Sequence, residues 1–79
     1  MKVKLLLFGG LRDYLPEKSD NRASLVDLPE ETRIKDLLDR LSLPAQLPKI
    51  IFLNGVKVGE EEGLTDGDRL SIFPPMVGG

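Results

Sequence analysis

Residues 29–41, PEETRIKDLLDRL, hold the clearest helix signal in the chain and decide its fold class. Thr32 is a favourable N-cap residue for a helix that starts within this segment. Apolar residues recur at i, i+3, i+4 and i+7, which places them on one face of that helix: Ile34, Leu37, Leu38 and Leu41. The pattern predicts one amphipathic helix whose leucine-rich stripe must be buried against another element.

Strand-prone runs flank this helix on both sides. Asn54-Gly55 supplies two residues that tolerate positive φ, which is typical of a two-residue hairpin turn. The predicted strands are 2–8 and 23–28 before the helix, and 50–53, 56–58 and 69–73 after it. One helix on one face of a mixed sheet of four to five strands buries both apolar surfaces economically. We therefore expect an α+β protein with a β-grasp arrangement.

Composition indicates one small globular domain that spans residues 1–79. The sequence contains no cysteine and no histidine, so thiolate chemistry and the usual general base and zinc ligands are excluded, and we expect no metal site and no catalytic residues of the chain's own. The net charge of −2 with scattered cations favours neither nucleic acid nor a membrane, and leans towards basic protein surfaces. The apolar run at 3–8 is too short to span a bilayer, so we expect a cytoplasmic protein.

The chain closes with FPPMVGG, residues 73–79, and this ending carries the strongest functional signal. Strand alternation predicts that Leu70 and Ile72 face the core and that Phe73 points outwards. Pro74 and Pro75 lack backbone N–H groups, so pairing must stop there and the backbone is held extended. The sequence therefore predicts that 74–79 forms a tail that protrudes from the domain.

Gly78 and Gly79 would give this tail a tip without side chains, which can pass through a narrow channel. The Gly79 carboxylate would then be the distinctive reactive group of the molecule. It is a poor acyl donor until AMP is transferred to it from ATP, after which sulfide or a lysine amine can attack. The competing interpretation is an end without function, because terminal residues are often poorly ordered.

The segment LTDGDRLSIFPPMVGG, residues 64–79, resembles the ubiquitin-like sulfur carriers of the MoaD/ThiS family, in particular MoaD-type small subunits of molybdopterin synthase. LLLFGGLRDYL, residues 5–15, is similar to the opening strand and the arginine-containing helical turn of that family. The resemblance covers nearly the whole chain and implies a ubiquitin-like β-grasp fold.

The resemblance also implies a reaction sequence. An E1-like adenylyltransferase (MoeB/ThiF type) would activate Gly79 with ATP, and sulfur transfer would convert it to a thiocarboxylate. The tail would then enter the large subunit of molybdopterin synthase (MoaE type) and donate sulfur for the dithiolene of the molybdenum or tungsten cofactor. The chain itself would bind no cofactor. Gly79 would bear the sulfur, and the residues of the tail that fit the channel and neck would be Gly78, Val77, Met76, Pro75 and Pro74.

A partner interface is expected beside the tail. If the first and last strands are neighbours, the residues that could form one exposed apolar patch are Leu6, Phe8 and Phe73, with Arg12 close by. The alternative for Leu6 is that a loop covers it. Three further functions remain open: a ThiS-like carrier for another pathway, a ubiquitin-like modifier joined to lysines through Gly79, and an interaction domain with an idle tail.

Overall fold

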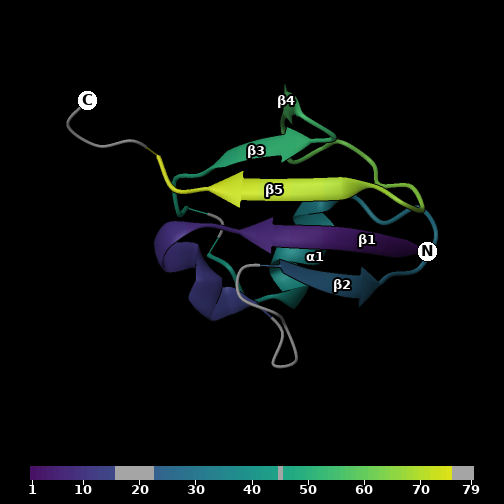
Figure 1. The fold of residues 1–79 in the computed structure, drawn as a ribbon, viewed down its shortest axis with the longest axis horizontal. Coiled ribbons are helices and arrows are strands. Elements are labelled where there is room, and N and C mark those ends of the chain that lie inside the picture. Colours follow the sequence, from purple (N-terminus) through teal and green to yellow (C-terminus); the bar gives the residue numbers. More distant parts are fainter. Residues whose placement is uncertain (16–22, 45, 76–79) are drawn as a thin grey trace.

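A computed structural model of the protein describes residues 1–15, 23–44 and 46–75 (Figure 1). Five strands form one sheet, and they are β1 (Lys2–Leu7), β2 (Ala23–Asp27), β3 (Ile50–Leu53), β4 (Val56–Val58) and β5 (Arg69–Phe73). The helices are a 3₁₀-helix η1 (Gly9–Tyr14) and an α-helix α1 (Ile34–Arg40). The expected α+β fold class, with a mixed sheet and one main helix, is confirmed.

The first and last strands of the chain pair in the middle of the sheet. The strand order is β2-β1-β5-β3-β4, and β1 and β5 run parallel with Leu5 opposite Leu70 and Leu7 opposite Ile72. All other neighbouring strands are antiparallel. The prediction that the first and last strands are neighbours is therefore correct, and it places the start of η1 beside the end of β5 (Figure 1).

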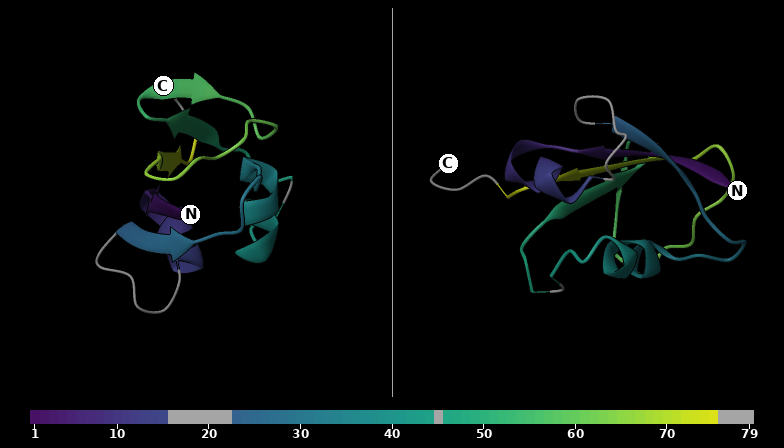
Figure 2. Two further views of the ribbon diagram at one scale, coloured as in Figure 1. Left: turned by 90° about the vertical axis from the view of Figure 1, so that its right-hand side faces the viewer. Right: turned by 90° about the horizontal axis from the view of Figure 1, so that it is seen from below.

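One face of the sheet is covered by α1, and Figure 2 shows the helix lying on one side only. The core between these two layers is built mostly from aliphatic side chains: Val3, Leu5, Leu7, Leu11, Leu28, Ile34, Leu37, Leu38, Leu43, Ile51, Leu64, Leu70 and Ile72. Leu41 is only half-buried, although it packs against this core. The opposite face of the sheet carries no helix in the described part of the chain, and we call it the open face.

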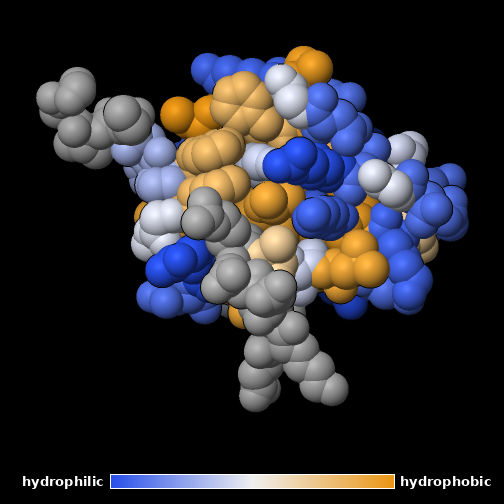
Figure 3. All heavy atoms as spheres, in the orientation of Figure 1, coloured by the Kyte–Doolittle hydropathy of each residue, from blue (hydrophilic) through white to orange (hydrophobic). Residues whose placement is uncertain are grey.

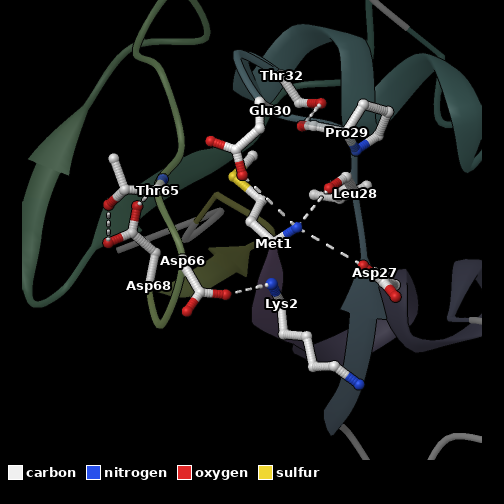
Figure 4. Close-up of polar contacts among 10 residues, drawn as sticks. All are labelled: Met1, Lys2, Asp27, Leu28, Pro29, Glu30, Thr32, Thr65, Asp66 and Asp68. Atoms are coloured by element: carbon white, nitrogen blue, oxygen red, sulfur yellow. Dashed lines mark hydrogen bonds and ion pairs between the residues drawn. The ribbon is translucent and has the colours of Figure 1, made fainter.

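The helix begins one residue later than the sequence predicts. Thr32 is not the N-cap, because its Oγ1 points back and donates a hydrogen bond to the Pro29 carbonyl at 2.7 Å (Figure 4). Arg33 is the N-cap residue, and its N–H donates to the Asp36 carboxylate at 3.0 Å. An aspartate three residues inside the helix thus satisfies the first backbone donor, as in a capping box.

The turns at the far end of the sheet from the tail form as expected. Asn54 and Gly55 adopt φ of 53° and 85°, which confirms the two-residue hairpin. Asp68 accepts hydrogen bonds from Thr65 N at 2.7 Å, Asn54 Nδ2 at 2.9 Å and Thr65 Oγ1 at 3.1 Å. Burial acts to raise the pKa of Asp68, but these hydrogen bonds outweigh it and hold the pKa below its usual range.

The first residue is tied to the segment after β2. Figure 4 shows the Met1 amino group between the Leu28 carbonyl, at 2.8 Å, and the Asp27 carboxylate, at 3.6 Å. Beside it, Lys2 N donates to Asp66 Oδ1 at 2.7 Å. These contacts fix the beginning of β1 against the turn that leads into β5. No helix in the described residues combines the length and apolarity that crossing a membrane requires.

Candidate functional site

An aromatic cluster on the open face marks the place where the chain leaves β5. Leu70 and Ile72 point into the core and are fully buried, so alternation turns Phe73 to the open face, as the sequence predicts. The rings of Phe8 and Phe73 stack with centroids 4.2 Å apart and planes at 6°. Phe52 meets Phe73 edge-on at 5.7 Å. We call Phe8, Phe52 and Phe73 the aromatic cluster, and all three side chains are half-buried.

The prediction of an exposed apolar patch is wrong for one of its residues, Leu6. Leu6 is only 7% exposed, so it adds little to the surface beside Phe8 and Phe73. It lies on β1, an interior strand paired on both edges, with Ala23 of β2 and Ser71 of β5 as its neighbours in register. Phe52, and not Leu6, is the third apolar residue beside Phe8 and Phe73. Alternation turns Phe52 to the open face because Ile51, its neighbour in the chain, points into the core.

The first tail residues pack against the domain. Pro74 lies so close to Gly9 that a Cβ on residue 9 would meet the Pro74 Cγ at 2.9 Å. Gly9 also has φ of 58°, in the left-handed region that favours glycine. Both Pro74 and Pro75 are half-buried. The neck of the tail is thus held in place by a glycine whose importance no motif in the sequence indicated.

Shallow hollows surround the neck and the aromatic cluster. An apolar hollow of about 340 Å³ is lined by Phe8, Gly9, Ile50, Phe52, Phe73 and Pro74. A second hollow, of about 300 Å³, lies between η1 and the loop before β3, and Tyr14, Leu47, Pro48 and Pro75 line part of it. In Figure 3 apolar residues gather on the open face where β5 ends. Half-buried aromatic rings beside apolar hollows are features of a protein-docking surface.

The remaining predicted site residues fall into two groups. Arg12 is exposed on η1, and among the described residues its guanidinium has no ion pair. The predictions for the end of the tail concern residues outside the described part of the chain: Met76, Val77, Gly78 and Gly79. The structure therefore brings Phe8, Phe73 and Pro74 together, leaves Leu6 buried, and adds Gly9 and Phe52 to the site.

Comparison with known proteins identifies relatives of the whole chain. The ThiS family matches residues 5–79. Among solved structures, SAMP1 from Haloferax volcanii superimposes with a TM-score of 0.74 at 24% identity over 100% of both chains. The protein assigned as molybdopterin converting factor subunit 1 from Pyrococcus furiosus gives a TM-score of 0.71 at 26% identity, over 95% of this chain and 98% of that one.

A third solved structure contains a protein complex. It is the complex of subunits 1 and 2 of the molybdopterin-converting factor from Helicobacter pylori, which gives a TM-score of 0.63 at 25% identity over 100% of both chains. No curated protein matches the sequence.

Proposed function

The chain belongs to the ThiS family, and on that premise we propose that it is a sulfur carrier that acts as the small subunit of a molybdopterin synthase. The observation that carries the proposal is the extent of the family match, which runs from β1 through the terminal glycines at 78–79. The aromatic cluster and the packed neck support it, because they provide a docking surface directly beside the point where the tail begins.

The proposed chemistry takes place at the Gly79 carboxylate. One carboxylate oxygen attacks the α-phosphate of ATP, which forms an acyl adenylate and releases pyrophosphate. Hydrosulfide then attacks the acyl carbon and expels AMP, and loss of its proton leaves a thiocarboxylate. Since the chain contains no cysteine, the sulfur must be delivered by another molecule. This chain supplies the acyl group and the surfaces that position it, while the enzymes it docks on catalyse the reactions and the adenylyltransferase binds ATP as its co-substrate.

The proposal requires two partners. An E1-like adenylyltransferase would form the adenylate, and a large synthase subunit would receive the charged tail. Support for the second partner comes from the Helicobacter pylori structure, in which a protein with 25% identity to this chain is in complex with a subunit 2. The similarity to the Pyrococcus furiosus protein, at 26% identity, is the observation that supports the molybdopterin pathway in this proposal.

Intact-mass spectrometry tests the carrier function. The purified chain is incubated with ATP, the E1-like adenylyltransferase of the same organism and a sulfur donor. We expect a mass gain equal to the replacement of one oxygen by one sulfur, and fragmentation should locate it at Gly79. The variant that lacks Gly79 should stay uncharged while it keeps the wild-type melting temperature. A charged variant without Gly79, or an uncharged wild type, would contradict the proposal.

Two further readouts separate the competing functions. Conversion of precursor to molybdopterin by the charged chain and a large synthase subunit would support the molybdopterin pathway, whereas charging without conversion would favour another sulfur-transfer pathway. A ubiquitin-like modifier would use the same adenylate but would end in isopeptide bonds. Lysine-linked Gly79 peptides in digests of cell extracts, without any thiocarboxylate, would favour the modifier.

A further inference from the structure

The open face of the sheet carries a group of cations beyond the aromatic cluster. Lys4 of β1 lies opposite Arg69 of β5 in the parallel register. Lys57 of β4 lies opposite Phe52, which itself lies opposite Ser71. Because residues paired across strands share a face, Lys4, Lys57 and Arg69 all project from the open face, and we call them the basic group. All three residues are exposed.

Most acidic side chains of the described residues lie away from this group. The exception on the open face is Asp27 of β2, which lies opposite Lys2 in register and 3.6 Å from the Met1 amino group. Glu61 lies 3.4 Å from Arg33 Nη1 and 3.8 Å from Lys35 Nζ, at the start of α1. Glu60 lies 3.2 Å from Lys49 Nζ. Within the described ranges, no ion pair involves a member of the basic group. Although the net charge is −2, the basic group on the open face thus has no ion-pair partner among residues 1–15, 23–44 and 46–75.

This arrangement is unfavourable for the isolated molecule. Lys4 and Arg69 are like charges on directly adjacent strands, and such pairs destabilise a sheet. On the other side of Lys4, its partner in register is Leu25, which is 66% exposed. Among the described residues no carboxylate neutralises the like-charge pair, so it lowers the stability of the free protein, and an acidic partner would remove that cost while its apolar side chains cover Leu25.

The basic group and the aromatic cluster form one continuous surface. A hollow of about 590 Å³ is lined by Phe52, Asn54, Gly55, Arg69, Ser71 and Phe73, so it joins Arg69 directly to two rings of the cluster. Figure 3 shows the same order along the face, with apolar residues near the end of β5 and strongly hydrophilic residues further back. A partner that contacts the aromatic cluster must also approach Arg69.

We propose that the open face docks an acidic protein surface, whose carboxylates pair with Lys4, Lys57 and Arg69 while its aliphatic side chains cover the aromatic cluster. The partner is the enzyme that adenylates Gly79, and this identification rests on the proposed function. It reverses the expectation from net charge, which favoured basic partner surfaces. Long-range attraction to the basic group would speed the encounter and bring the tail to the partner's active site.

The test is the rate of association between the full chain and the E1-like adenylyltransferase, measured by stopped-flow fluorescence without ATP. Lys4→Glu should reduce the association rate constant about 10-fold or more at low ionic strength, and the difference from wild type should shrink at about 0.5 M salt. Arg40→Glu is the matched control, because it makes the same change of charge at an exposed residue on α1. It should leave the rate constant within about two-fold of wild type.

A second readout excludes a simple folding defect. Lys4→Glu replaces a like-charge pair with an opposite-charge pair, so its melting temperature should rise while its association slows. Equal association rates for Lys4→Glu and Arg40→Glu, or no association by wild type, would overturn the docking inference. Thiocarboxylate yield, measured by intact mass in the same samples, reports on the carrier function separately. Normal charging of wild type with no effect of Lys4→Glu would refute only the docking inference.

Discussion

Replacement of Gly9 by alanine tests whether the neck of the tail is fixed by the domain. Gly9 has φ of 58°, and an alanine in that left-handed region costs about 1–2 kcal/mol. The added Cβ would also meet the Pro74 Cγ at 2.9 Å, a ring atom that cannot rotate away as the end of a flexible side chain can. Together these effects should destabilise the fold by about 2 kcal/mol or more.

Thermal unfolding followed by circular dichroism measures this loss. For a domain of this size, about 2 kcal/mol corresponds to a fall in Tm of about 8–16 °C. Gly10→Ala is the matched control, since a Cβ at Gly10 would have no neighbouring atom within 4 Å and Gly10 is not among the residues with positive φ. We expect Gly10→Ala to stay within about 0.5 kcal/mol of wild type.

A double-mutant cycle separates the two causes. Pro74→Ala removes the ring atom that the new Cβ would strike, so in that background Gly9→Ala should cost only the backbone term of about 1–2 kcal/mol. The difference between the two backgrounds gives the energy of the clash between the added Cβ at position 9 and the Pro74 ring. The reasoning is refuted if Gly9→Ala is as stable as Gly10→Ala, or if its cost is the same with and without Pro74.

Three further predictions concern other parts of the molecule. Phe73→Ala removes the ring that contacts both Phe8 and Phe52, and it should lower the free energy of unfolding in urea by about 1–3 kcal/mol. Val56→Ala, at an exposed residue, is the control and should lower it by less than about 0.5 kcal/mol. Equal losses for the two variants would contradict the packing of Phe73. Asp68 has a lowered pKa in the folded state, so its stabilising effect is present above the unfolded pKa of about 3.9 and is lost as pH falls through the folded pKa. The stability difference between wild type and Asp68→Asn, about 1 kcal/mol at neutral pH, should therefore shrink in acid, and a difference independent of pH would argue against this origin. Glu61→Gln removes two exposed ion pairs and should change the free energy of unfolding in urea by less than about 1 kcal/mol. A larger loss would mean that these pairs stabilise the start of α1 more than exposed pairs usually do.

Local sequence patterns predicted the elements well, because each pattern depends on neighbouring residues only. The 3.6-residue period placed the leucines of α1, and Asn54-Gly55 fixed the hairpin through its positive φ angles. Thr32 was misassigned because a hydroxyl can serve either the helix start or a preceding carbonyl, and the local pattern is the same in both cases. For Leu6 the pattern left exposure and burial open, and the residue is buried, because alternation assigns a side chain to a face but does not specify what packs around it there.

The sequence by itself determined the order of the elements, the outward turn of Phe73 and the position at which pairing must end, because alternation and proline act along the chain. Only the tertiary structure decided what surrounds that position. The parallel pairing of β1 with β5 joins residues from opposite ends of the sequence, and it is this register that stacks Phe8 on Phe73, sets Gly9 against Pro74 and places Lys4 beside Arg69. Contacts between residues so far apart along the chain depend on how two strands align, and no local pattern specifies that alignment.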